Sequence, residues 1–183
     1  MKKNLKFILA LLLTAAFASP VFAAMPKKGE VAVIAIGMSD YSSEFVHMVE
    51  DSVVQELLSA GYRVVDEATK RKIHQAVAQR KADDAYLRGD VNALMKISFG
   101  YSVATTIAVR FRVDEAENTI DTGRHKGYTN SVSITFNAKN SGGDYTRASQ
   151  SPIMTTGAGV TPAKATNRAV IAAAAKIAAA LTR

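Results

Sequence analysis

The sequence predicts an α/β protein in which helices pack on a mixed β-sheet. Residues 30–36 are an almost uninterrupted apolar run closed by Gly37, which is typical of a strand buried on both faces. After Gly100 the hydrophobic side chains change from a helical period to strict alternation, which indicates half-buried antiparallel strands. Both signals in one chain favour a single mixed sheet, and the expected order of elements is β-α-β-α-α-β-β-β-α.

The first half of the predicted domain alternates strands with helices. Apolar residues recur every four positions from Phe45 to Leu57, with acidic and amide side chains on the far face, so this segment is predicted to be an amphipathic helix. Gly61 lies just past it, where a left-handed residue commonly ends a helix. A short strand at 62–65 follows at once, and links this short imply a right-handed crossover between parallel neighbours.

The second half is predicted to be mostly antiparallel. Apolar and polar residues alternate at 101–113 and again at 128–139, so both segments are expected to be strands with one wet face. The segment between them, 114–127, is polar and is predicted to be a loop. Asn140–Gly143 is a strong hairpin signal, and residues 144–155 after it are predicted to form a poorer strand at a sheet edge.

The last predicted element is an alanine-rich helix that ends near Leu181. Thr161 is the candidate N-cap, and Pro162 suits the first helical position. Alanine side chains allow the helix axis to lie close to whatever it packs against. The preceding segment Gly157–Gly159 is interpreted as a flexible connection, with an anion-binding turn as the alternative.

The N-terminus has the layout of a cleavable secretory signal. A basic start is followed by an apolar run that is too short to span a bilayer, and small residues allow cleavage after Ala23. We therefore expect a signal peptide at 1–23, a flexible leader at 24–29 and a single α/β domain at 30–183. The expected location is the periplasm.

Charge and cysteine content exclude several kinds of partner. The net charge is +7, and it falls to +4 once the three lysines of the predicted signal are removed. So small an excess over a whole domain does not indicate nucleic-acid binding, and no nucleic-acid partner is expected. The absence of cysteine excludes disulfides, thiolate metal sites and a lipid-modified N-terminal Cys, so membrane association is expected to be peripheral at most.

Motifs for catalysis or metal binding are absent from the sequence. His47, His74 and His125 lack the spacing of a zinc site, so a site would need long-range convergence, and the two helical histidines are interpreted as solvent-facing. The acid pairs Glu50-Asp51 and Asp83-Asp84 diverge on a helix by about 100° and are interpreted as solvated surface charge. No serine-nucleophile motif occurs. The sequence therefore predicts no catalytic residue, no metal ligand, no cofactor and no enzyme activity.

The densest basic patch is the one candidate binding surface. It lies on the first of two central helices, which are predicted at 67–80 and 90–99. The patch is either a solvated helix face or a docking surface for an acidic partner or a lipid headgroup. Its members, the candidate partner-binding residues, are Lys70, Arg71, Lys72 and Arg80.

Four segments resemble one family of cell-envelope proteins. They read VAVIAIG, ELLSAGYRVVDEATKRKIHQ, ALMKISFGYSVATTIAVRF and GAGVTPAKATNRAVIAAAAKIAAAL. The pattern resembles the family of the curli-secretion lipoproteins and the penicillin-binding-protein activators over residues 30–182, most specifically at Gly61–Asp66 and Gly157–Ala180. The chain departs from that family in three places: it has no lipobox Cys, reads Phe99-Gly100-Tyr101 at the helix-to-strand junction, and carries no long insertion for membrane hairpins.

The resemblance implies a non-enzymatic accessory role based on contacts between proteins. The first interpretation is a periplasmic accessory or assembly protein that binds another envelope protein and is capable of homo-oligomerisation. The alternative is an oligomeric, outer-membrane-associated secretion or transport component. An enzyme ranks third, because the sequence contains no site for one.

Overall fold

The structure, a computed structural model, describes residues 23–37, 41–80, 91–121 and 126–183. The predicted signal peptide up to residue 22, the Asp83-Asp84 pair and His125 therefore lie outside the described residues. Among the helices that are described, none has the length and apolar character needed to cross a membrane.

The predicted mixed sheet is confirmed. Its strands run in the spatial order β2-β1-β3-β4-β5, and β6 pairs with another stretch of β4. β1 is parallel to both of its neighbours, whereas β3, β4, β5 and β6 pair antiparallel. The strands are β1 (Glu30–Gly37), β2 (Arg63–Val64), β3 (Thr105–Asp121), β4 (Lys126–Asn140), β5 (Thr146–Ala148) and β6 (Ile153–Gly159).

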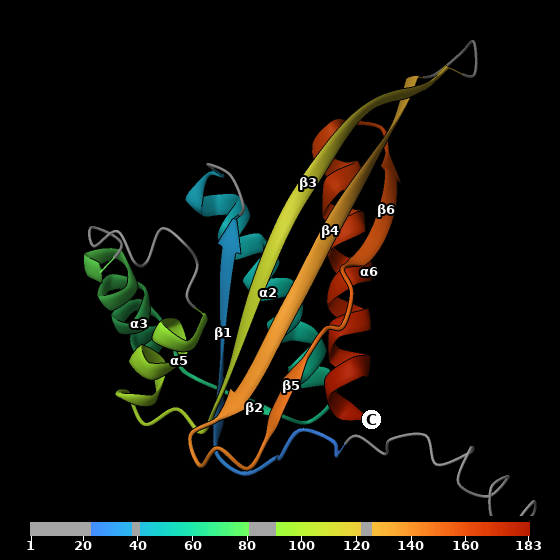
Figure 1. The fold of residues 1–183 in the computed structure, drawn as a ribbon. Coiled ribbons are helices and arrows are strands. Elements are labelled where there is room, and N and C mark those ends of the chain that lie inside the picture. Colours follow the sequence, from blue (N-terminus) through green and yellow to red (C-terminus); the bar gives the residue numbers. More distant parts are fainter. Residues whose placement is uncertain (1–22, 38–40, 81–90, 122–125) are drawn as a thin grey trace, which may run out of the picture.

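Helices cover the sheet from both sides (Figure 1). They are α2 (Ser43–Ser59), α3 (Glu67–Arg80), α5 (Val91–Phe99) and α6 (Pro162–Thr182). Because side chains alternate along β1, Val31 and Val33 join the core under α2 and α6, while Ala32 and Ile34 join a second core under α3 and α5. This double burial explains the continuous apolar run of β1.

Local signals mark the helix ends where the sequence predicts them. Gly61 adopts φ +81°, so it supplies the left-handed residue after α2. At the start of α6 the Thr161 side chain accepts a hydrogen bond from the Lys164 amide at 3.2 Å, with Pro162 in the first turn.

The prediction of a loop at 114–127 is wrong over most of its length. The β3–β4 ladder crosses an irregularity after Asp114 and continues to the pair Asp121 and Lys126. The paired ends project beyond the rest of the sheet (Figure 1). Backbone pairing with β4, rather than an alternating apolar pattern, defines this part of β3 as a strand.

The end of the sheet also differs from the prediction. Residues 144–155 do not form one strand: β5 is short, and β6 takes in Gly157 and Gly159, which were interpreted as a flexible connection. A methyl group at either glycine would overlap the backbone of α6 near Ala165. Close packing of strand on helix therefore requires glycine there, and the alanine-rich face of α6 allows the same approach.

The segment 24–29, predicted as a flexible leader, is attached to the domain. Met25 is 2% exposed, and its amide donates to the Leu181 carbonyl at 2.7 Å. The Tyr62 hydroxyl donates to the Met25 carbonyl at 2.9 Å. Backbone next to the predicted cleavage point therefore packs against the end of α6.

Candidate functional site

The predicted basic patch is partly neutralised by neighbouring acids. The Lys70 side chain is only 15% exposed, and its Nζ lies 2.8 Å from Asp51 Oδ1 and 3.8 Å from Glu50 Oε2. Burial alone would lower the pKa of Lys70, but the hydrogen bond to Asp51 and the nearby carboxylate charges outweigh it and raise that pKa. Arg71 and Lys72 are exposed, and the side chain of Arg80 lies outside the described residues.

Glu50 is buried, which corrects its assignment to the solvated surface. Its side chain is 0% exposed, whereas that of neighbouring Asp51 is 60% exposed. Glu50 Oε1 accepts a hydrogen bond from the Ala35 amide at 2.8 Å. β2 pairs with β1 only at Glu30 and Val31, so the carboxylate accepts a hydrogen bond from an amide of β1 beside which no described strand lies.

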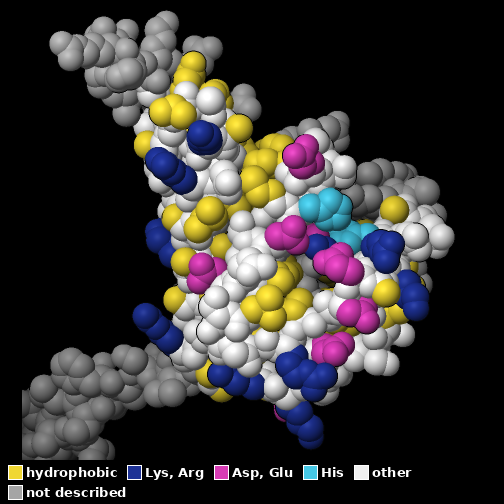
Figure 2. Space-filling model, turned by 180° about the vertical axis from the view of Figure 1, so that it is seen from behind, with side chains coloured by type: hydrophobic (Ala, Val, Ile, Leu, Met, Phe, Trp, Pro, Cys, Tyr) yellow, Lys and Arg dark blue, Asp and Glu magenta, His cyan; other side chains and the backbone are white. Residues whose placement is uncertain are grey.

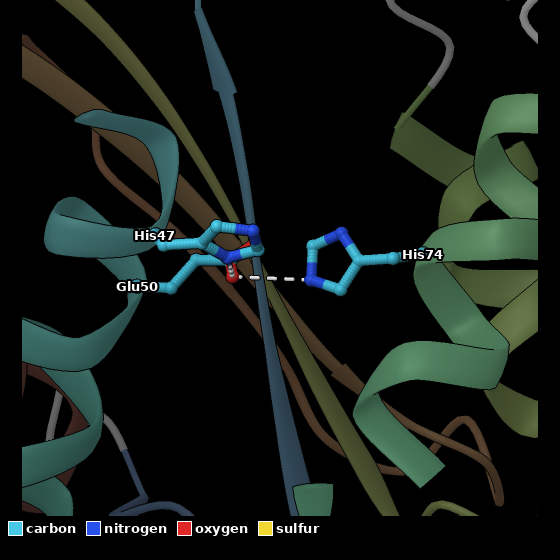
Figure 3. Close-up of side chains that lie close together, drawn as sticks. All are labelled: His47, Glu50 and His74. Carbon is cyan, nitrogen blue, oxygen red and sulfur yellow. Dashed lines mark hydrogen bonds and ion pairs between the residues drawn. The ribbon is translucent and has the colours of Figure 1, made fainter. Parts of the chain in front are cut away.

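Two histidines converge on this carboxylate: the side chain of His47 is 49% exposed, as predicted, whereas that of His74 is only 27% exposed. Glu50 Oε2 lies 3.1 Å from His74 Nε2 and 3.5 Å from His47 Nδ1 (Figure 3). The imidazole rings meet edge to face, with centroids 5.4 Å apart. His47 and Glu50 come from α2 and His74 from α3, and the three ligand atoms lie within 4.8 Å of one another.

Part of this cluster was visible in the sequence. Glu50 falls in the apolar stripe of α2, four residues after Val46 and three before Val53, where a charged residue signals a buried polar contact. His47 lies three residues before Glu50 and therefore projects from the same side of the helix. No sequence pattern connects His74 to this pair, because its position depends on how α3 packs.

Three hollows lined by described residues adjoin the cluster, and one of them, beside α3 and of about 450 Å³, is lined by both histidines. A second, of about 330 Å³, lies between β1, α2, α3 and α5, and its lining includes His47 and His74. The third is an open groove of about 650 Å³ along α2, with Ile171 of α6 on its far side. Figure 2 shows the histidines on this face, with acidic and basic side chains next to them and apolar side chains exposed nearby.

Known proteins show little similarity to this chain. No protein-family model matches the chain, and no curated protein matches it. Two similar solved structures are PelC dodecamers from Paraburkholderia phytofirmans. One, a variant with a single substitution, is 12% identical, with 88% of this chain and 95% of that chain covered and a TM-score of 0.48. The other is 14% identical, with 84% and 91% covered and a TM-score of 0.37.

The resemblance to the curli-secretion and activator family stays a prediction.

Proposed function

We propose that this chain is a non-enzymatic accessory or assembly protein of the cell envelope, exported to the periplasm, where it binds another envelope protein. The observation that carries the proposal is the open groove beside α2. It combines apolar side chains with carboxylates and polar side chains, a composition suited to anchoring a segment of a partner.

The residues of the groove indicate the chemistry of that segment. Met48 and Ile171 form its apolar part, and Ile171 is 48% exposed. Glu44 and Glu56 supply carboxylates, and Asp51, which is paired with Lys70, lies between them; no lysine or arginine is among the described residues that line the groove. We infer a basic partner segment with an apolar anchor, because such a segment complements both features.

This site replaces the basic patch as the expected contact surface. Lys70 already has Asp51 as a hydrogen-bond partner, so the patch offers less free charge to an acidic partner than the sequence suggests. Arg71 and Lys72 remain outside the groove and serve as comparison positions.

A site-specific photo-crosslinker tests the groove. Placed at Ile171, it is expected to yield a defined crosslinked product in intact cells, because the side chain faces the bound segment. A matched crosslinker at Leu58, which is 47% exposed and does not line the groove, is expected to yield none.

The charge of the groove is tested in the same assay. Glu44→Lys with Glu56→Lys is expected to abolish the Ile171 product, since the groove would then repel a basic segment. Lys72→Glu is the control and is expected to preserve it. Equal crosslinking from both positions, or a product that survives charge reversal, would contradict the proposed partner chemistry.

Export is tested separately by N-terminal sequencing of the protein recovered from the periplasm. The expected first residue is Ala24, because the signal layout allows cleavage after Ala23. Recovery of an uncleaved chain from the cytoplasm would contradict the proposed location.

The oligomeric alternative is favoured by a different feature. β1 pairs with β3 only as far as Gly37 and Phe111, so beyond the Val113 amide, which donates to the Tyr41 hydroxyl at 2.9 Å, the outer edge of β3 has no strand beside it among the described residues. The outer edge of β6 is protected, since Lys176 and Arg168 donate to the Met154 and Ala158 carbonyls. Sedimentation velocity distinguishes the candidates: a stable multimer at low concentration favours the alternative, and a monomer counts against it.

A further inference from the structure

The cluster of His47, Glu50 and His74 has the composition and geometry of a metal site. We propose that these three residues bind one divalent transition-metal ion, for which Zn²⁺ is the best match. His47 also lines the partner groove, but the proposal is tested on the isolated chain, where no partner is present.

The spacing of the ligand atoms suits zinc. Tetrahedral zinc with bonds of about 2.0–2.1 Å separates its ligand atoms by about 3.4 Å. In the structure, Glu50 Oε2 lies 3.1 Å from His74 Nε2 and 3.5 Å from His47 Nδ1. All three atoms lie within 4.8 Å of one another, so small side-chain rotations bring them around one ion.

A backbone amide of β1 also fixes the orientation of one proposed ligand, Glu50. The Ala35 amide fixes Glu50 Oε1 at 2.8 Å, which leaves Oε2 directed at both imidazoles. A backbone donor to a ligating carboxylate is the kind of outer contact that orients metal ligands. His47 comes from the same helix three residues earlier, so α2 presents two ligands from one face.

The ligand set predicts both the metal and an open position. Two imidazoles with one carboxylate is a combination that zinc uses when it keeps its fourth position for water or another molecule. His47 and His74 line the hollow of about 330 Å³ and another of about 450 Å³ beside α3. Water or a side chain of a partner therefore has a route to the fourth position.

Lys70 is the main opposing charge. Its Nζ lies 3.8 Å from Glu50 Oε2, where a cation competes with a metal ion. Asp51 Oδ1 at 2.8 Å and Glu67 Oε1 at 3.9 Å hold Lys70 from its other side. Lys70 can therefore move away from Glu50 without losing its closest partner.

The experiment measures zinc binding to the purified full-length chain without a polyhistidine tag. After treatment with a chelator, the protein is titrated with ZnCl₂ against a zinc-sensitive dye. The expected result is about one zinc ion per chain, a melting temperature that rises with zinc, and a visible absorption band typical of tetrahedral coordination when Co²⁺ replaces Zn²⁺.

Ligand variants establish where the ion binds. His47→Ala and His74→Ala are each expected to weaken zinc binding by at least about 100-fold, beyond the usual loss for an outer-shell change. Glu50→Gln keeps an acceptor for the Ala35 amide and is expected to weaken binding likewise. The matched controls are Gln75→Ala, beside His74, and Glu56→Gln, a partly exposed acid on α2, and both should bind as the unaltered chain does.

The site is tested even if Glu50→Gln does not fold. His47 is 49% exposed, so His47→Ala is expected to keep the melting temperature of the metal-free protein while losing the rise with zinc. Substoichiometric zinc, or binding that both histidine variants retain, would overturn the proposal. Neither result bears on the crosslinking at Ile171, so failures of the two proposals are distinguishable.

Discussion

At the scale of single residues, the unusual feature is a carboxylate without solvent exposure. Glu50 satisfies the edge amide of Ala35 and lies beside His74, with Lys70 as a further counter-charge. A buried charge that loses its partner becomes costly, because neither water nor another group replaces the lost contact. Lys70 therefore stabilises the fold, in contrast to the exposed residues that follow it on α3.

Replacing Lys70 measures this contribution. Lys70→Met is expected to lower the free energy of unfolding by about 1–3 kcal/mol, since it leaves Glu50 with fewer partners. Arg71→Met, on the exposed side of the same helix, is expected to change it by no more than about 0.5 kcal/mol. Urea denaturation at neutral pH gives both values, and equal losses would show that Lys70 has no special role.

At the scale of elements, the contact between β6 and α6 is a close one. Gly157 and Gly159 present no side chain, and the facing helix presents Ala165 and Ala169. The Thr155 hydroxyl adds a hydrogen bond of 2.7 Å to the Ala169 carbonyl. Backbone packs on backbone here, so the contact tolerates no added volume.

Gly157→Ala tests this packing. The added methyl group is expected to destabilise the protein by about 1–3 kcal/mol or more, because it would overlap backbone atoms of α6 that cannot rotate away. Ala158→Ser, on the exposed face of the same strand, is the control and should shift stability by less than about 0.5 kcal/mol. Thermal unfolding compares the two variants. A Gly157→Ala variant with unchanged stability would show that β6 shifts away from α6 at no cost in free energy.

At the scale of the whole molecule, the two ends of the described chain hold each other in place. The Met25 amide bonds to Leu181, and Tyr62 holds the Met25 carbonyl from the other side. Lys27 adds a bond of 2.8 Å from its Nζ to the Ala60 carbonyl. The segment that follows the predicted signal peptide is therefore part of the folded domain.

Tyr62→Phe is expected to weaken this connection. Loss of the hydroxyl leaves the Met25 carbonyl unpaired and should cost about 1 kcal/mol, whereas the same change at exposed Tyr101 should cost little. Urea denaturation of both variants checks the difference. Similar losses at the two positions would contradict a specific role for Tyr62.

The same residue predicts a pH dependence. Burial raises the pKa of Tyr62 above its ordinary value of 10.0, so the folded protein keeps this proton after the unfolded chain has lost it. The contribution of Tyr62 to the free energy of unfolding is therefore complete below pH 10.0 and is lost as the pH rises above it. The free energy of unfolding of Tyr62→Phe should fall less steeply with pH. Burial also raises the pKa of Tyr145, which accounts for part of the remaining slope. Identical slopes would contradict this assignment.

Local patterns in the sequence determined the class of the fold. The apolar run of β1, the four-residue recurrence in α2 and the N-cap of α6 each describe which faces of one element are buried and where it ends. These properties depend on neighbours along the chain, so periodicity and capping predict them. The predicted elements consequently occur in the predicted order, apart from the division of the last edge strand.

Three features depend on the tertiary structure: the extended β3–β4 ribbon, the packing role of the glycines in β6, and the position of His74 in the candidate site. Pairing with Lys126–Ser131 makes the polar part of β3 a strand, and its side-chain pattern does not show this. His74 reaches Glu50 because α2 and α3, from opposite faces of the sheet, meet at the edge of β1 beyond the end of β2. Distances between elements depend on register and packing across the sheet, which no spacing along one helix encodes.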